Sequence, residues 1–289
     1  MSALKRRLFD FCPGEFTFRL GTETKIMGVL NVTPDSFSDG GSFLDAGLAE
    51  ARALQMEREG AHFLDIGGES SRPGARPVPE KEEIRRVVPV VKRLAGKIKI
   101  PISVDTTKYG VARAALDEGA AVINDITALK NNKRLAKLIA RAKAGVVLMH
   151  MRGTPRTMQK NPAYRDVTKD VLCFLKRAVS EALETGIPKS RILIDPGFGF
   201  GKTVDQNLRL LSHLDDFAGL GCPLLVGLSR KSFVVHVIGA AVNDRLYGSL
   251  GAAAVAVQRG AHVLRVHEVL PHRQLAALMD RTLATEGVR

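Results

Sequence analysis

Short apolar segments alternate along the chain with longer segments in which apolar residues recur at helical spacing. The apolar segments are rich in Val, Ile and Leu, which is typical of strands buried on both faces. Eight such segments, separated by helices, predict a parallel sheet closed into a single (β/α)8 TIM barrel of the α/β class. The segments lie at residues 26–30, 62–66, 100–104, 121–123, 145–149, 192–194, 223–226 and 261–266.

An internal repeat supports this alternation. Gly60-Ala61, Gly119-Ala120 and Gly260-Ala261 each end a helical pattern and open an apolar segment, and residues 143–145 form a degenerate copy. Glycine is favoured just past a helix end because it adopts a left-handed conformation at little cost. We expect helices at about residues 46–59, 80–95, 108–118, 131–143, 164–185, 204–212, 245–259 and 271–285.

The first 24 residues precede the first barrel strand. Residues 16–20 alternate weakly between apolar and polar, and Gly21-Thr22 is typical of a turn. We therefore expect a short N-terminal extension, residues 1–24, that forms a small hairpin at the bottom of the barrel. Residues 25–289 are expected to form one barrel domain, because no linker follows and such a barrel takes about 250 residues.

The charge and cysteine content narrow the range of partners and compartments. The chain has 43 Lys and Arg against 30 Asp and Glu, a net charge of +13, spread along the sequence rather than in blocks. Such an excess steers anionic small molecules, and we expect no nucleic-acid partner because no nucleic-acid-binding motif is present. No apolar run suits a membrane span or a signal peptide. Cys12, Cys173 and Cys222 are too few and too far apart for a disulfide framework, which favours a reducing cytoplasm.

Polar residues follow the apolar segments, at the strand ends where a barrel of this class carries its active site. Two long loops, 33–43 and 67–78, exceed the usual two to six residues, so we expect lids or substrate clamps, with tolerated surface insertions as the alternative. The polar residues are Asn31, Gly67-Gly68-Glu69, Asp105, Asn124-Asp125, His150, Asp195, Ser229-Arg230-Lys231, Arg265 and His267.

Asp105, Asn124 and Asp195 form the most suggestive group of these. Carboxylates and an amide that converge on a barrel mouth suit a flat heterocycle rich in N–H groups, because a carboxylate can accept two parallel hydrogen bonds. The alternative is that each Asp simply caps the helix that follows it.

A second group suits an anion. Ser229-Arg230-Lys231-Ser232 is expected to open a helix, whose N-terminal N–H groups bind anions. Arg265 and His267 share a strand face by period two, and barrels often bind phosphate near strands seven and eight. The alternative is a solvated surface cluster.

Two motif-like stretches fail on inspection. Residues 195–203 resemble a nucleotide-binding loop, but Pro196 occupies a required glycine position of the Walker A motif and Lys202 that of the dinucleotide fingerprint. We expect a flexible turn that places Asp195 at the barrel mouth, or else a purely structural loop. Residues 267–272 resemble a zinc-protease motif, but they have one residue too many and contain Pro271.

Together these segments resemble the dihydropteroate synthases, a pterin-binding enzyme family, over roughly residues 24–270. The most specific are MGVLNVTPDSFSDGG at 27–41, DIGGESSRPG at 65–74 and DPGFGFGK at 195–202. The shorter matches are 103–106, 123–125, 149–151, 229–232 and 265–267, all in the family's order.

The resemblance implies that 6-hydroxymethyl-7,8-dihydropterin diphosphate condenses with 4-aminobenzoate to give 7,8-dihydropteroate and diphosphate, in folate biosynthesis. It further implies a Mg²⁺ ion on the diphosphate, a homodimer and a sulfonamide target. By the same resemblance, the pterin is held by Asp105, Asn124, Asp195 and Lys231 and is covered by Arg265. The diphosphate is bound by Arg265 and His267, and its Mg²⁺ ion is ligated by Asn31. The second substrate and the phosphates meet Ser71 and Arg72, and the aminobenzoate pocket is lined by Phe37, Pro73, Phe200 and Ser232. The implied catalytic residues are Asp105, Lys231, Arg265 and His267.

Two departures and two alternatives accompany the resemblance. Ser71 stands where the family usually has Thr, and residues 233–239 are less typical. A methyltetrahydrofolate-binding methyltransferase would share the pterin site but has no use for the diphosphate-binding residues. A silent paralogue that only binds pterin is the other alternative, and the intact motifs of both long loops weigh against it.

Overall fold

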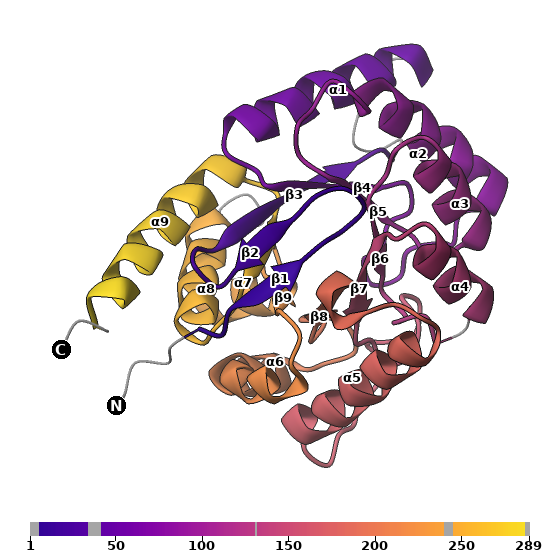
Figure 1. The fold of residues 1–289 in the computed structure, drawn as a ribbon. Coiled ribbons are helices and arrows are strands. Elements are labelled where there is room, and N and C mark those ends of the chain that lie inside the picture. Colours follow the sequence, from indigo (N-terminus) through magenta and orange to yellow (C-terminus); the bar gives the residue numbers. More distant parts are fainter. Residues whose placement is uncertain (1–5, 34–41, 131, 240–244, 287–289) are drawn as a thin grey trace.

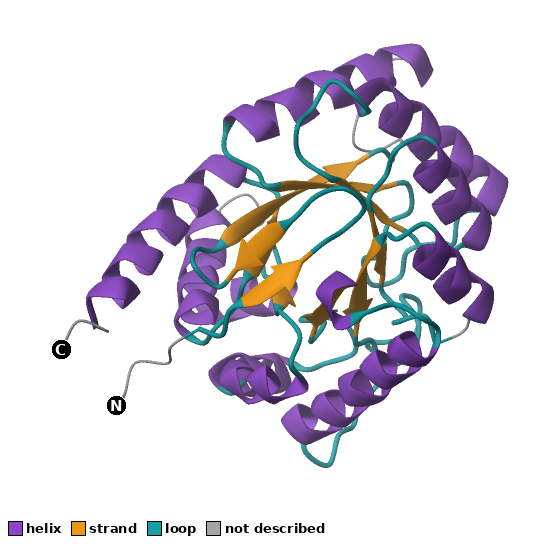
Figure 2. Cartoon of the chain, in the orientation of Figure 1, coloured by secondary structure: helices purple, strands orange, loops and turns teal. Residues whose placement is uncertain are grey.

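The structure, a computed structural model, describes residues 6–33, 42–130, 132–239 and 245–286. Eight parallel strands form a barrel, and helices pack around its outside (Figure 1, Figure 2). The strands are β3 (Lys25–Asn31), β4 (Phe63–Gly67), β5 (Ile102–Asp105), β6 (Val122–Asp125), β7 (Gly145–Met149), β8 (Ile192–Asp195), β9 (Leu225–Val226) and β10 (Val263–Val266).

The strand order confirms the predicted barrel. Hydrogen bonds link the strands in the order β8-β7-β6-β5-β4-β3-β10-β9, always in parallel. A bridge between Ile194 and Leu224 then brings the two edge strands together. Every predicted strand overlaps an observed one, because strands buried on both faces leave an unbroken apolar signal.

The helices also follow the expected positions. Each predicted helix overlaps an observed one, whereas the 3₁₀ segment η3 (Leu214–Leu220) was not expected, since seven residues show little periodicity. No helix among the described residues is long and apolar enough to cross a membrane. The helices are α1 (Ser42–Arg58), α2 (Glu80–Leu94), α3 (Tyr109–Asp117), α4 (Lys133–Arg141), α5 (Val167–Glu184), α6 (Val204–Ser212), α7 (Ser232–Ile238), α8 (Leu246–Gln258) and α9 (Val269–Glu286), with a 3₁₀ turn η2 (Lys189–Arg191).

The N-terminal segment forms the expected hairpin. Strand β1 (Phe9–Phe11) pairs antiparallel with β2 (Phe18–Leu20), and Phe11 and Leu20 are fully buried against the lower end of the barrel. Gly21 is not the hairpin turn: it leads from β2 into β3 with φ +104°, and a side chain there would lie 2.3 Å from the Arg7 carbonyl oxygen. The hairpin therefore closes the bottom of the barrel and leaves the strand ends at the other side open.

The repeated helix–Gly–Ala–strand joints take one conformation. Gly60, Gly119 and Gly260 have φ of 95°, 105° and 93°, the left-handed region that glycine tolerates best. In the degenerate copy, Lys143 takes the same role with φ 55°. The repeat thus marks a backbone requirement at the bottom of the barrel, which Lys143 meets at some cost in strain.

The lumen is filled at its lower end by apolar side chains. Seven of the eight strands contribute one, and β5 contributes the buried Ser103. A larger apolar cluster lies outside the strands, between them and the helices. The lumenal residues are Met27, Phe63, Val122, Val147, Leu193, Leu225 and Val263.

Candidate active site

Two residues beyond this apolar floor, the lumenal positions become polar on most strands. Successive side chains of a strand point to opposite faces, so residues two apart share the lumen. The register places Asp105 of β5 beside both Gly67 of β4 and Asn124 of β6. The polar lumenal residues are Asp65 on β4, Asp105 on β5, Asn124 on β6, Asp195 on β8 and Arg265 on β10.

Arg265 joins two carboxylates of this layer. Its Nε donates to Asp65 Oδ2 at 2.6 Å, and its Nη2 donates to Asp105 Oδ2 at 2.9 Å. Asn124 Nδ2 donates to the same Asp65 oxygen at 3.1 Å. Asp65 is completely buried. It therefore holds Arg265 and Asn124 in place from below, while Asp105 faces the opening.

Burial and these charges shift the pKa values of the layer. Burial raises the pKa of Asp105 to about 7, opposed by Arg265 and reinforced by Asp65. Burial also raises the pKa of Asp195. Burial and the nearby Arg265 lower the pKa of Lys231 to about 8. Near neutral pH, Asp105 and Lys231 can thus gain or lose a proton at small cost, as ligand-binding acid–base groups do.

Lys231 and Phe200 line the hollow together and contact each other. Lys231 precedes α7, and its Nζ lies 4.1 Å from the centre of the Phe200 ring, a cation–π contact. Asp195 Oδ1 accepts a hydrogen bond of 2.7 Å from the backbone N–H of Gly197. That bond folds the segment after β8 back over the strand end and brings Phe200 to the mouth.

These side chains line one hollow at the strand ends. Ile126, Met149 and Phe198 add an apolar wall that the sequence analysis did not identify. The predicted site residues that line the hollow are Ser71, Asp105, Asn124, Asp195, Phe200, Lys231 and Arg265.

The remaining predicted residues surround this hollow or lie outside the described chain. Arg72 and Pro73 are exposed on the loop after β4, and Ser232 is the exposed first residue of α7. His267 follows β10. Phe37 lies outside the described residues, as does most of the first long loop.

His267 lies at the barrel mouth, close to several cationic side chains. Its Nδ1 is 3.0 Å from Ser229 Oγ, and Ser229 Oγ lies 3.3 Å from Glu268 Oε2. Burial lowers the pKa of His267 to about 3, and Arg265, Arg230, Lys231 and Arg72 add to the effect. Ser229 itself is buried. The predicted anion group is therefore brought together, and the alternative of a solvated surface cluster does not hold for Ser229.

The loop after β4 is anchored at its base. The ammonium of Lys108 lies between the carboxylates of Glu69 and Glu83 and pairs with both. Arg86 Nη1 donates to the Gly68 carbonyl at 3.0 Å. These contacts fix the beginning of the loop on α2 and α3, so that Ser71 reaches the hollow.

Two interpretations of the sequence are corrected here. Neither Asp caps the next helix: the N-cap residues of α3 and α6 are Lys108 and Thr203. The expected flexible turn at 195–203 is instead tied down, because the buried Lys202 Nζ donates to the Gly197 and Phe200 carbonyls at 2.8 and 3.2 Å.

Three residues of the site were missed from the sequence: Asp65, Lys202 and Glu268. Asp65 left a usable signal, since it is the one charged residue of its own strand, flanked at period two by Phe63 and Gly67. Lys202 left none, because lysine in a glycine-rich stretch is usually exposed.

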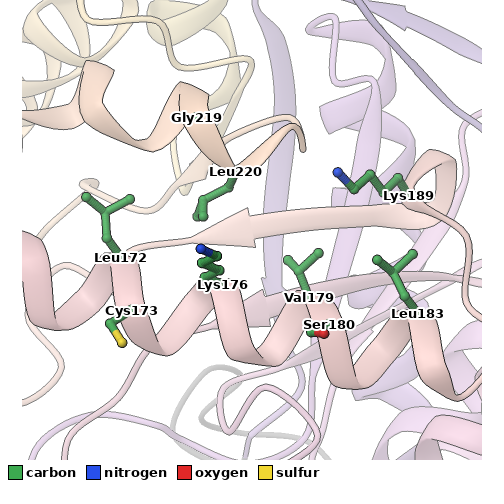
Figure 3. A pocket seen from close by; sticks show the side chains of 9 residues that line it. All are labelled: Leu172, Cys173, Lys176, Val179, Ser180, Leu183, Lys189, Gly219 and Leu220. Carbon is green, nitrogen blue, oxygen red and sulfur yellow. The ribbon is translucent and has the colours of Figure 1, made fainter.

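A larger hollow lies on the outside of the barrel, between α5 and η3 (Figure 3). Its lining combines Leu172, Val179 and Leu220 with the side chains of Lys176 and Lys189. It is formed by the outer helix layer rather than by the strand ends, and the polar residues of the lumen do not reach it. We therefore assign the active site to the lumenal hollow.

The residues near Asn31 fit a metal ion only if other ligands, such as phosphate oxygens and waters, complete its coordination. Asn31 ends β3 beside Gly67, where an added side-chain carbon would lie 3.5 Å from Asn31 Oδ1. Among the described residues, no group of three His, Cys, Asp or Glu side chains could hold a metal ion. An amide oxygen next to a glycine suits Mg²⁺ that keeps its waters and arrives with phosphate oxygens.

Comparisons with known proteins agree on one family. A family model described as pterin binding enzyme matches residues 27–267. A dihydropteroate synthase of Haemophilus influenzae is 48% identical over 245 residues, 85% of this chain and 89% of that protein. The Xanthomonas albilineans dihydropteroate synthase solved with 4-aminobenzoic acid has a TM-score of 0.89 and 43% identity, with 96% and 99% of the two chains covered. A Yersinia pestis dihydropteroate synthase solved with a sulfonamide drug has a TM-score of 0.89 and 40% identity, with 96% and 100% covered.

Proposed function

This chain belongs to the pterin-binding enzymes, and we propose that it carries out the dihydropteroate synthase reaction as a transferase of folate biosynthesis. In that reaction 6-hydroxymethyl-7,8-dihydropterin diphosphate condenses with 4-aminobenzoate, giving 7,8-dihydropteroate and diphosphate. The main support from this chain is one hollow in which Asp105, Asn124 and Asp195 converge with Lys231 and Arg265.

The pterin ring binds deep in the hollow. Its N–H and amino groups donate to the carboxylates of Asp105 and Asp195, and Asn124 offers both a donor and an acceptor. Ionised carboxylates that are already buried accept such bonds strongly, because no water competes. Lys231 donates to the ring from the opposite side, and the apolar wall of Met149 covers its edge.

Departure of diphosphate is the step that needs positive charge. Arg265, Arg72 and the N–H groups near His267 neutralise the leaving group, which lowers the barrier to C–O cleavage. Asn31 would hold a Mg²⁺ ion bound to the diphosphate, and that ion would supply further charge neutralisation.

The second substrate approaches from the outer part of the hollow. Phe200 packs on one face of the aminobenzoate ring, and Ser232 with Lys231 meets its carboxylate at the start of α7. The amine then attacks the exocyclic methylene of the pterin, and its proton passes to solvent or to the departing diphosphate. Pro73 and Phe37, from the two long loops, complete the pocket and exclude water.

A homodimer is the assembly that the exposed apolar residues favour. Tyr247 of α8 is 75% exposed and Leu278 of α9 is 70% exposed, and α8 packs between α7 and α9 (Figure 1). Val237 of α7, the helix on the other side of α8, is 53% exposed. Exposed apolar residues gathered on neighbouring helices favour burial against a second copy. Tyr247→Asp should give a monomer in sedimentation velocity, whereas Leu183→Asp on α5 should not change the assembly.

The free cysteines and the aminobenzoate pocket favour a cytoplasmic location and sensitivity to sulfonamides. Cys12, Cys173 and Cys222 are all free thiols, which suits a reducing cytoplasm. A sulfonamide that imitates 4-aminobenzoate would occupy the space between Phe200 and Ser232. Competition with 4-aminobenzoate in a steady-state assay tests this point.

Replacement of the two central cations tests the proposed roles. Lys231→Ala and Arg265→Ala should each lower kcat/KM by about 100-fold or more, because Lys231 contacts the pterin and the aminobenzoate carboxylate and Arg265 contacts the pterin and the leaving group. Lys176→Ala, on the outer hollow, is the matched control and should leave turnover unchanged. Near-normal kcat/KM for either lumenal variant would contradict its assigned role.

A further inference from the structure

A hydrogen-bonded chain of side chains stands behind His267. Ser229 Oγ lies 3.0 Å from His267 Nδ1 and 3.3 Å from Glu268 Oε2. The backbone N–H of His267 donates to the same hydroxyl oxygen at 3.3 Å. Glu268 is held in turn by Arg230, whose Nε donates to Oε1 at 2.6 Å.

The hydroxyl of Ser229 has one hydrogen for two acceptors. If it donates to His267 Nδ1, the ring carries its proton on Nε2. If it donates to Glu268, it can accept from a protonated Nδ1 instead. Among the described residues no hydrogen bond is made by the other ring nitrogen of His267. Nε2 is therefore the ring atom available to a ligand.

A bound anion changes the balance of charge around the His267 ring. Burial and four cations keep the ring neutral in the free protein, since they lower its pKa to about 3. A bound diphosphate opposes those cations, so it favours a second proton on the ring. The charged groups facing His267 are Arg265 on its own strand, Arg230 and Lys231 before α7, Arg72 of the loop after β4, Arg52 of α1, which donates to its carbonyl, and Glu268.

We propose that Ser229 and Glu268 are positioning residues that keep His267 Nε2 a hydrogen-bond donor toward diphosphate in both charge states of the ring. The inference rests on the proposed function for the identity of the anion. With the ring neutral, Ser229 donates to Nδ1 and Nε2 keeps its hydrogen. With the ring protonated, Nδ1 donates to Ser229 and Ser229 donates to Glu268.

The proton balance is simple. One proton enters from solvent at Nδ1 when diphosphate binds, and the hydroxyl hydrogen of Ser229 turns from Nδ1 to Glu268 Oε2. The proton returns to solvent when diphosphate leaves. No bond other than N–H is made or broken.

The backbone around Ser229 is built to hold this geometry. Arg230 has φ 60°, a left-handed conformation that costs a non-glycine residue free energy. Its N–H donates to Ser249 Oγ at 3.0 Å, and Ser249 is completely buried. Strain that is held in place by a buried partner, next to a ligand site, marks a conformation that the site requires.

Binding of inorganic diphosphate with Mg²⁺, followed by calorimetry over a range of pH, tests the proposal without turnover. Ser229→Ala should weaken diphosphate binding about tenfold, the loss of one hydrogen bond to a charged group. Ser229→Thr should restore most of it. As pH rises, diphosphate binding weakens when the His267 ring loses its second proton. In Glu268→Gln this weakening should occur at lower pH than in the wild type, because the Glu268 carboxylate no longer stabilises the protonated ring.

The chain offers a matched control. Ser212 Oγ lies 2.9 Å from the Nδ1 atom of the exposed His213, at the end of α6. Ser212→Ala removes the same kind of pair away from the lumen, so it should leave diphosphate binding unchanged. Thermal unfolding of every variant reports whether it folds.

The outcomes distinguish the positioning role of Ser229 and Glu268 from the proposed reaction. Weaker diphosphate binding in Ser229→Ala, with the calorimetric affinity for 4-aminobenzoate unchanged, supports the positioning role of Ser229 even if the wild type gives no dihydropteroate. Equal diphosphate affinity and equal pH dependence in Ser229→Ala, Glu268→Gln and Ser212→Ala would overturn it, whether or not the enzyme turns over. A uniform loss of folding and of both substrates in Ser229→Ala that Ser229→Thr does not repair would also overturn it.

Discussion

Replacement of Asp65 by Asn tests how the lumenal layer is held together. The carboxylate accepts from Arg265 Nε at 2.6 Å and from Asn124 Nδ2 at 3.1 Å, and it is completely buried. Asn keeps the shape and one acceptor oxygen but removes the charge. Arg265 remains paired with Asp105, so the variant should lose roughly 1–3 kcal/mol of unfolding free energy rather than the larger cost of a fully unpaired charge.

The same substitution should change the pH dependence of turnover. Asp65 is a like charge that helps raise the pKa of Asp105, whose value is about 7. Asp105 must be ionised to accept from pterin, so kcat/KM falls as pH drops through that value. Without the Asp65 charge the pKa of Asp105 is lower, and the acid limb should move down by on the order of one pH unit.

Steady-state kcat/KM for the pterin substrate, measured between about pH 5 and pH 9, reports this shift. Asp280→Asn is the control, because it breaks an ion pair with Arg6 at 2.7 Å at the opposite end of the barrel and should leave the acid limb in place. An unchanged or raised acid limb in Asp65→Asn, with folding intact, would show that the Asp65 charge does not raise the pKa of Asp105.

Three further predictions concern other parts of the chain. Burial lowers the pKa of His262 to about 4, so its contribution to stability is full above pH 6.5 and is lost as pH falls from 6.5 toward 4; urea unfolding at pH 5 should show a cost of about 2 kcal/mol that His262→Gln removes. Lys143→Gly should stabilise the fold by about 1 kcal/mol by relieving its left-handed backbone, whereas Gly119→Ala should destabilise it by a similar amount, both read from urea midpoints. Lys202→Met frees the segment after β8, so KM for 4-aminobenzoate should rise roughly tenfold, and an unchanged KM would show that the segment holds itself.

The barrel and its polar layer are readable from the sequence because one periodicity encodes both. A strand buried on two faces gives an apolar run, and the residue after that run lies at the open end of the barrel. Asp105, Asn124 and Asp195 were found in this way. Asp65 was not, since it lies within the run and reads as a fault in an apolar strand until its period-two neighbours are considered.

Contacts between segments far apart in sequence were beyond reach. Ser229 and Glu268 meet because β9 and β10 are neighbours, and nothing local marks either as a partner of His267. Lys202 is buried because the segment after β8 folds over it, a tertiary effect that overrides its usual preference for solvent. The hairpin was expected from the weak alternation at residues 16–20. That β2 pairs with the preceding β1, rather than with a later strand, came only from the structure.

Turnover by the purified chain is the decisive test of the synthase assignment. The purified chain is given dihydropterin diphosphate and Mg²⁺, and diphosphate and dihydropteroate are followed together with and without 4-aminobenzoate. We expect equal amounts of both products, dependent on 4-aminobenzoate and lost in Lys231→Ala. Tight binding of the pterin with neither product formed would contradict the synthase assignment and favour a methyltransferase or a protein that only binds pterin.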